Sequence, residues 1–155
     1  MKWTASISLR FDIDVPPAED FWRLFATTGW NEEYRLPSEK LFSAISNSWR
    51  AVSVYQEGSL VGFGRIVSDG VLHAMIYDLI VDPAWQGRGI GAEILRRLVG
   101  FCQDAEICDI QLFCARGKRE FYEKRGFKAR AEDSPGMQYV NAAAIRGTET
   151  SSSLL

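Results

Sequence analysis

The chain has 155 residues, a formal net charge of −2, and 46% hydrophobic against 25% charged residues, a balance typical of one soluble globular domain rather than a disordered or fibrous chain. Without a basic excess, a nucleic-acid backbone or an anionic membrane would find little general attraction, so we expect neither as a partner. No apolar run approaches the roughly 20 residues of a membrane helix, and residues 1–11 lack a secretory signal's apolar stretch, which predicts a cytoplasmic protein.

The first part of the chain predicts one strand followed by two helices. Residues 4–11 alternate apolar and polar side chains, as a half-buried strand does, until two prolines interrupt the pattern. A helix should follow from Ala18, with acidic residues in its first turn and Gly29 at its end. A second helix is expected to begin near Ser38.

The middle of the chain predicts a hairpin and a buried strand. Strands are expected at residues 49–55 and 60–67, joined by a turn that contains Gly58. Residues 71–81 are nearly all apolar, which indicates a central strand covered on both faces. Asp78 is the only acidic residue in this run.

The last third of the chain predicts a long helix with shorter elements after it. In chain order these are a helix at 90–102, a strand at 109–114, a short helix at 118–125, and final strands from 127 onward and at 137–140. Beyond these elements the sequence becomes small and polar. We therefore expect a single domain at 1–141 and a flexible C-terminal tail at 142–155.

The cysteines and the histidine indicate neither disulfides nor a metal. Cys102, Cys108 and Cys114 are odd in number and form no C-x-x-C pair, so we expect reduced thiols. The one histidine, His73, lies early in the predicted central strand and is interpreted as structural. No carboxylate and histidine cluster has ligand spacing, so we expect no catalytic metal.

A glycine-rich turn between the central strand and the long helix is the most informative segment. It reads Gln86-Gly87-Arg88-Gly89-Ile90-Gly91-Ala92. The first amides of a helix lack intrahelical acceptors and lie at the positive end of its dipole, while glycine lets a ligand approach the backbone. The turn therefore suits a pyrophosphate, to which Arg88 can add a cation.

The same glycines also satisfy the dinucleotide fingerprint G-x-G-x-x-G/A, with Asp109 at about the right distance. In that fold the first glycine follows its strand almost directly, whereas five residues intervene here. Asp109 would moreover begin the next strand rather than end it. A nicotinamide-binding oxidoreductase is thus a weak alternative, and the Walker pattern for nucleotide triphosphates is absent.

Residues 86–91 fit the pattern Gln/Arg-x-x-Gly-x-Gly/Ala of the GNAT superfamily of N-acetyltransferases. The flanking residues 81–85 and 121–127 are also similar to that family, so the resemblance spans about 49–140, while the first helices resemble it only in order. It implies an α/β (α+β) fold. The sheet would be mixed, mostly antiparallel and twisted, with about six to seven strands and about four helices, splayed between strands 4 and 5.

Short matches at 77–81, 108–110, 121–122 and 136–137 look like the plant and cyanobacterial serotonin (arylalkylamine) N-acetyltransferase group within the superfamily. That narrower resemblance would imply arylalkylamine acceptors. The family's common state further implies a homodimer.

The family resemblance implies acetyl-CoA as cosubstrate and places its parts on this chain. Backbone groups of Ile80 and Val81 would bind the pantetheine arm. The pyrophosphate would meet the glycine-rich turn, whose members are Gln86, Gly87, Arg88, Gly89, Ile90, Gly91 and Ala92. Competing interpretations make Trp85 a packing residue and Arg88 solvated surface.

The chemistry needs a base for the amine and an acid for the leaving thiolate. Asp78, in an apolar strand, is the candidate base because partial desolvation makes a carboxylate a stronger proton acceptor; alternatively it pairs with a nearby Arg or Lys, or only positions the amine. Tyr122 is the candidate acid, since the family places a tyrosine at this position for that task.

Aromatic and acidic residues before the sheet fall in the region that shapes the acceptor pocket in this family. Trp30, Glu33 and Tyr34 are the candidates to receive a cationic amine, through ring faces and a carboxylate. Core packing is the competing explanation for such side chains.

We therefore predict an acetyl-CoA-dependent N-acetyltransferase that moves an acetyl group to a primary amine, by direct attack in a ternary complex. The acceptor would be a small amine or a peptide or protein amine. The alternative is a non-catalytic CoA-binding module with an interaction or regulatory role, because function belongs to sites rather than to folds.

Overall fold

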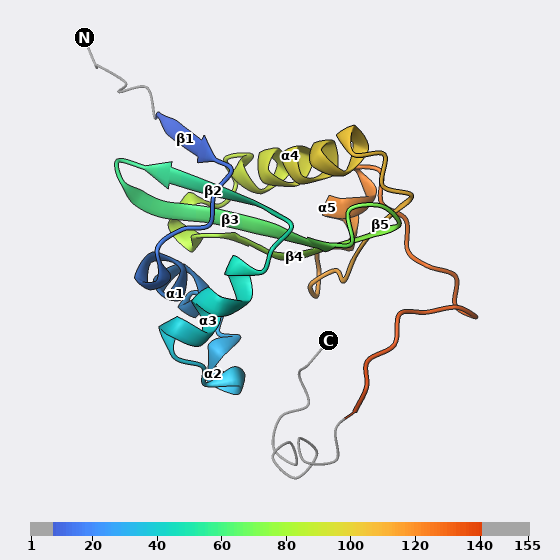
Figure 1. Cartoon of the computed structure of the whole chain (residues 1–155), viewed down its shortest axis with the longest axis horizontal. Coiled ribbons are helices and arrows are strands. Elements are labelled where there is room, and N and C mark those ends of the chain that lie inside the picture. The colour runs from blue at the N-terminus through green and yellow to red at the C-terminus, as the bar shows by residue number, and fades with distance from the viewer. Residues whose placement is uncertain (1–7, 141–155) are drawn as a thin grey trace. The chain divides into compact units, whose positions relative to one another are not determined.

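The computed structural model describes residues 8–140, and Figure 1 labels its elements. In chain order they are β1 (Leu9–Asp12), α1 (Ala18–Ala26), α2 (Asn31–Tyr34), α3 (Ser38–Ser46), β2 (Arg50–Gln56), β3 (Ser59–Ser68), β4 (His73–Val81), a 3-10 turn η1 (Pro83–Trp85), α4 (Ile90–Asp104), β5 (Asp109–Leu112) and α5 (Arg119–Glu123). The chain divides into two compact units, residues 1–112 and 113–155. Among the described helices, none is both long and apolar enough to cross a membrane.

The first unit is built on one five-stranded sheet in the order β1-β2-β3-β4-β5. The junctions from β1 to β4 are antiparallel, whereas β5 runs parallel to β4. The mixed, mostly antiparallel α/β fold predicted from the sequence is thus confirmed. Pairing of β5 with β4 stops at Ile76, opposite Leu112, so the last five residues of β4 extend beyond the paired segment.

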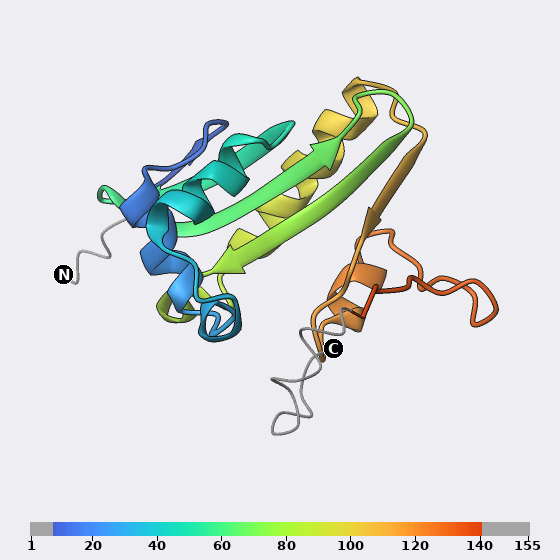
Figure 2. The same ribbon diagram turned by 60° about the horizontal axis from the view of Figure 1, so that its bottom comes forward.

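Helices cover both faces of this sheet, as Figures 1 and 2 show, with α1, α2 and α3 on one face and α4 on the other. On the first face, buried residues of α1 and α3 pack against buried residues of β2, β3 and β4. The members of this core are Phe21, Leu24, Phe25, Leu41, Ile45, Ala51, Phe63 and Ile80. Phe21 and Phe63 meet edge to face with ring centroids 4.9 Å apart. This core fixes α1 and α3 on the sheet that carries Asp78.

On the opposite face, α4 lies close against β3 because two glycines leave room for it. A Cβ on Gly64 would lie 2.7 Å from Ile94 Cγ2 and 2.9 Å from Leu98 Cδ1, and one on Gly62 would lie 3.0 Å from Ile94 Cδ1. Ile90, Ile94 and Leu98 are fully or almost fully buried. This close packing holds α4, which follows β4 after η1 and the glycine-rich turn, against this face of the sheet.

Most predicted elements form within one or two residues of their expected bounds, but the final strands were wrong. No strand occurs in residues 127–140, so the sheet has five strands among the described residues rather than six or seven. Residues 128–135 are mostly charged or small and end in proline, so they offer no apolar face to bury. Met137 and Tyr139 alternate as strand residues do, yet they are 86% and 89% exposed.

Two further differences concern the ends and one short helix. The short helix α2 was not predicted, because four residues carry no detectable periodicity. The first strand covers only Leu9–Asp12 of the described chain. Residues 4–7 of the predicted strand and the predicted tail at 142–155 lie outside the described residues.

The same change at two glycines should affect stability in opposite directions. We expect Gly64→Ala to lower the free energy of unfolding by about 1–3 kcal/mol, because the new methyl overlaps the branched Ile94 side chain. Gly100→Ala, inside α4 with no atom within 4 Å of the new methyl, should raise it by about 0.5–1 kcal/mol. Urea unfolding of both variants measures the difference, and a neutral Gly64→Ala would show that α4 does not need this close approach.

Candidate active site

A bulge in β4 shapes the centre of the candidate site. Arg65 pairs with Tyr77 and Phe63 pairs with Ile80, so Asp78 and Leu79 both lie opposite the single residue Gly64. Asp78 has a φ of +53°. Among the described residues it is the one non-glycine residue inside a strand with a left-handed backbone.

Arg65 holds the Asp78 carboxylate on the face of the sheet that α1 and α3 cover. Arg65 Nε donates to Asp78 Oδ2 at 2.5 Å, and the two side chains are only 16% and 19% exposed. Arg65 Nη1 also donates to the carbonyl of Ala44 in α3 at 3.1 Å, and its Cζ lies 5.8 Å from the centre of the Tyr77 ring. The pairing with a nearby arginine, one of the alternatives for Asp78, is therefore present.

The end of β4 leaves backbone groups on the side where β5 no longer pairs. The Asp82 amide donates to the Val61 carbonyl at 2.8 Å. Because hydrogen-bonding direction alternates along an antiparallel ladder, the backbone groups of Ile80 face β3 and those of Val81 face away from it. Gln86 Nε2 donates to the Val81 carbonyl at 3.1 Å, which links the glycine-rich turn to the end of β4. The Val81 amide faces the edge of β4 that β5 does not pair.

The glycine-rich turn has room beside its backbone. Gly87 and Gly89 have φ values of +74° and +82°, and a Cβ added at either position would meet no atom within 4 Å. Gly89 is the N-cap of α4 and makes no side-chain capping bond. The amides of the first turn of α4, from Ile90 to Ala92, have no acceptor within their own 15-residue helix.

Arg88 and Trp85 form one unit at the mouth of this turn. The guanidinium carbon of Arg88 lies 4.6 Å from the centre of the Trp85 ring, and Arg88 itself is exposed. Asp82 Oδ1 accepts from the Ala84 amide at 2.8 Å and so caps η1. The turn therefore presents a cation supported by an aromatic ring beside free helix amides.

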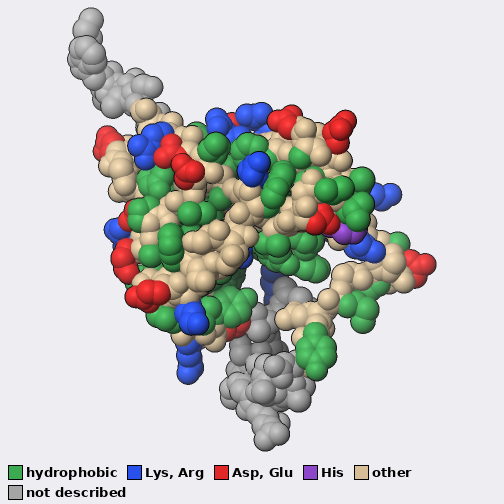
Figure 3. All heavy atoms as spheres, in the orientation of Figure 1, with side chains coloured by type: hydrophobic (Ala, Val, Ile, Leu, Met, Phe, Trp, Pro, Cys, Tyr) green, Lys and Arg blue, Asp and Glu red, His purple; other side chains and the backbone are tan. Residues whose placement is uncertain are grey.

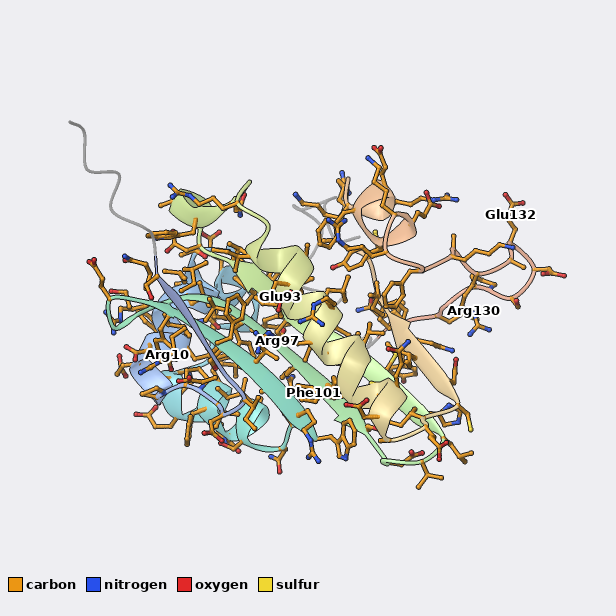
Figure 4. All side chains as sticks on the ribbon, turned by 90° about the horizontal axis from the view of Figure 1, so that it is seen from above. Arg10, Glu93, Arg97, Phe101, Arg130 and Glu132 are labelled. Carbon is orange, nitrogen blue, oxygen red and sulfur yellow. The ribbon has the colours of Figure 1, made fainter. Side chains whose placement is uncertain are left out.

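Glu93 would be expected to repel an anion at the start of α4, but two arginines neutralise it. Arg96 donates to both carboxylate oxygens and Arg97 Nε donates to Oε1, each at 2.8 Å. Figure 4 shows Glu93, Arg97 and Phe101 in order along α4, and Arg97 reaches over the Phe11 ring of β1 at 4.5 Å. The hydrogen bonds from Arg96, followed by those from Arg97, hold the pKa of Glu93 at about 2.

Tyr122 lies on α5 in the second unit, apart from the other candidate residues along the chain. It is half-buried and packs edge to face against Phe121 and Phe127, at centroid distances of 5.0 and 6.0 Å. Burial raises the pKa of Tyr122, and the electrostatic influence of Cys114 raises it further. The hydroxyl is therefore kept protonated at neutral pH, as a proton donor must be.

The three predicted acceptor residues stand at the surface of the first unit, on and beside α2. Trp30 packs edge to face on Phe25 at 5.8 Å and Tyr34 stacks near the same ring at 6.4 Å. Trp30 is 37% exposed and Tyr34 60% exposed, and Glu33 is exposed as well. They form an aromatic shelf of Phe25, Trp30 and Tyr34 whose outer rings are open to solvent, rather than a buried core cluster.

Charge elsewhere does not gather into a field of one sign. On the face shown in Figure 3, basic and acidic side chains are intermixed over the first unit. A cavity of about 210 Å³ lies between α1 and the β2–β3 turn, where Asp20 and Arg23 pair with each other. It contains none of the predicted site residues.

Within residues 8–140, no three His, Cys, Asp or Glu side chains are grouped as metal ligands would be.

Comparison with known proteins decides the family. The model of the acetyltransferase (GNAT) family matches residues 17–127, which include the bulged strand, the glycine-rich turn and Tyr122. The chain belongs to the GNAT family of acetyltransferases. Members of this family use acetyl-CoA as the donor of an acetyl group.

Relatives of this GNAT protein are known from plants and bacteria. Histone acetyltransferase TAP1 of Glycine max is 34% identical over 137 residues, which cover 81% of this chain and 57% of that protein. GCN5-related N-acetyltransferase 2, chloroplastic, of Arabidopsis thaliana is 31% identical over 146 residues, covering 81% and 54%. The chain thus spans about half the length of these curated relatives.

A solved GNAT structure from Streptococcus pneumoniae TIGR4 superposes with a TM-score of 0.73 at 27% identity, covering 88% of this chain and 99% of that one. The fold of this GNAT protein is therefore shared almost over its full described length.

One residue of the site, Arg65, was missed by sequence analysis. The available signal was spacing: side chains two residues apart in a strand point to the same face, so Arg65 shares the face of Phe63, which packs in the core.

The Glu93 carboxylate should make stability in this GNAT protein depend on acid pH. Its folded pKa of about 2 lies below the usual 4.5, so its contribution is present above about pH 4.5 and is lost as the pH falls toward 2. With the side chain 31% exposed, solvent screening limits the effect, and we expect Glu93→Gln to cost about 0.5–1 kcal/mol at pH 7.

Urea unfolding at pH 7, 4 and 2.5 measures this difference. The matched control is Glu39→Gln, another glutamate in the first turn of a helix, for which no ion pair occurs among the described residues. We expect a Glu93 effect that shrinks with falling pH and a small, flat Glu39 effect. A Glu93 effect that is the same at pH 7 and pH 2.5 would show that the arginine pair does not act through the charge.

Proposed function

We propose that this GNAT protein transfers the acetyl group of acetyl-CoA to a primary amine by direct attack. The observation that supports this most is the conjunction, in the first unit, of an open glycine-rich turn at the start of α4 with the acid Asp78 on the bulge of β4. Both flank the stretch of β4 that extends beyond β5. A thioester carrier and an amine would then meet along one strand.

The glycine-rich turn is the proposed holder of the cosubstrate. The backbone of Gly87 to Ala92 and the side chains of Gln86 and Arg88 would receive the pyrophosphate, because uncapped helix amides and a cation favour a dianion. The backbone of β4 around Val81, on the side that faces away from β3, would bind the pantetheine arm, whereas the backbone groups of Ile80 face β3. Gly87 and Gly89 fit this role because side chains there would fill the space a phosphate needs.

The chain's own groups would then move two protons. Asp78, or a water that it orients, takes a proton from the ammonium, and the free amine attacks the carbonyl carbon. The Val81 amide donates to the developing oxyanion. As the carbon–sulfur bond breaks, the Tyr122 hydroxyl donates its proton to the leaving thiolate, and the second proton lost by the nitrogen returns to Tyr122 through solvent, which leaves an amide product and free CoA.

The acceptor is proposed to be a cationic amine that rests on the aromatic shelf. Trp30 and Tyr34 offer ring faces and Glu33 a carboxylate, which suits an arylalkylamine such as those used by the serotonin N-acetyltransferase group. The relative named as a histone acetyltransferase supports a protein amine as the second candidate. A non-catalytic CoA-binding module is the alternative function, and it requires no role for Tyr122.

Assembly and location complete the proposal. A homodimer follows from the family's common state. The cytoplasm is predicted from the sequence, and the Arabidopsis relative described as chloroplastic makes a plastid the alternative.

Release of CoA thiol from acetyl-CoA with a panel of amines tests the proposed activity. The panel contains arylalkylamines, polyamines, amino acids and peptides with free amino termini or lysines. We expect at least one class to stimulate release well above the rate without amine. Binding of acetyl-CoA without stimulation by any of them would favour the non-catalytic module.

Tyr122→Phe separates a proton donor from a packing residue. We expect it to lower kcat by about 10²-fold or more, with little change in the KM for acetyl-CoA, because the ring stays and only the hydroxyl is lost. The matched control is Tyr139→Phe, an 89% exposed tyrosine of the same unit, which should leave kcat unchanged. Equal kcat values for Tyr122→Phe and the unaltered protein would remove the acid role.

A further inference from the structure

The left-handed backbone of Asp78 calls for a stabilising partner. A non-glycine residue with positive φ inside a strand is strained and persists only where its surroundings hold it. The bulge also changes which way the following residues of β4 present their backbone groups. Whatever holds Asp78 therefore also holds the strand segment that leads to Val81.

Arg65 is the side chain that holds it. The guanidinium contacts the Asp78 carboxylate through Nε and the Ala44 carbonyl, at the end of α3, through Nη1. Its planar group thereby links the bulge of β4 to the last turn of the helix that covers it. These contacts use donors in fixed directions, which a flexible ammonium could not reproduce together.

This ion pair differs from the others in the described chain by its burial. Arg65 and Asp78 are 16% and 19% exposed, whereas the next strand pair, Arg10 with Asp12, is 66% and 36% exposed. Partly buried charges are screened less by solvent and salt, so this pair constrains geometry where a surface pair would not. It also leaves Asp78 Oδ1 as the oxygen with which an amine could interact.

We propose that Arg65 is a positioning residue for acetyl transfer: it holds Asp78 on the bulge and fixes the direction of its carboxylate toward the acceptor amine. This proposal rests on the proposed function, in which Asp78 serves the amine. Arg65 itself touches neither substrate. Its loss should therefore impair use of the amine and spare the binding of acetyl-CoA.

Three variants test the role in steady-state kinetics. We expect Arg65→Gln to lower kcat/KM for the amine by about 10-fold to 100-fold, with the KM for acetyl-CoA within about twofold. Arg65→Lys keeps the charge and should recover part of the loss. Arg10→Gln, the matched control from the exposed pair labelled at Arg10 in Figure 4, should change neither constant.

A double-mutant cycle with Asp78→Asn distinguishes positioning from general structural support. Asparagine tolerates a left-handed backbone but carries no charge, so the fold of the bulge should persist while the ion pair is lost. If Arg65 acts through Asp78, adding Arg65→Gln to Asp78→Asn should cost less than about twofold more. The same fold-loss in both backgrounds would overturn the proposal.

Hydrogen exchange of the peptide that covers β4 gives a readout that does not need activity. We expect Arg65→Gln and the double variant to exchange faster at the end of β4, and Arg65→Lys to lie between them and the unaltered protein. Should the unaltered protein show no amine-stimulated release, the proposed function fails, yet unchanged exchange in Arg65→Gln would separately overturn the positioning role. If Arg65→Gln does not fold, Arg65→Lys is tested alone. Values of hydrogen exchange and of kcat/KM in Arg65→Lys that equal those of the unaltered protein would then overturn the proposal.

Discussion

Free amides at the start of a long helix have to find an acceptor, and in this protein none is supplied by the described chain. Gly89 caps α4 without a side-chain bond, and no atom fills the space beside Gly87 and Gly89. The small residues Gly62 and Gly64 let α4 lie close to β3, which fixes the start of that helix against the sheet. Arg96 and Arg97 pair with the carboxylate of Glu93, the one acid in the first turn, and balance its negative charge. This arrangement is the basis of the proposal that the turn receives an anion with two phosphates.

The second requirement is that the reacting end of such a ligand reaches the proton acceptor. Pairing between β4 and β5 ends at Ile76, and the bulge at Asp78 follows within two residues. The strand therefore opens on one edge and turns an acid toward its helix-covered face at the same place. Arg65 links that acid to α3, and in the proposed function the acceptor amine and the cosubstrate both bind along β4.

Much of the fold could be predicted because the signals are local. The apolar run of β4, the helical spacing of α4 and the glycines of the turn each follow from the side chains of one segment. The bulge could not, because a slip of one residue against β3 depends on pairing between segments distant in sequence. Arg65 was missed for the same reason, since its partner is defined only by that register. The final strands failed because alternation at Met137 and Tyr139 forms a strand only where a neighbouring strand is available.

The most direct test of whether the helix amides bind phosphate is calorimetric titration of the purified protein with CoA and, in parallel, with pantetheine. Pantetheine keeps the arm that would lie along β4 and lacks the pyrophosphate. We expect CoA to bind with measurable heat and pantetheine to bind at least about 100-fold more weakly, the loss of several charge-assisted hydrogen bonds. Equal affinities, or no heat with either compound, would contradict a phosphate site at the start of α4.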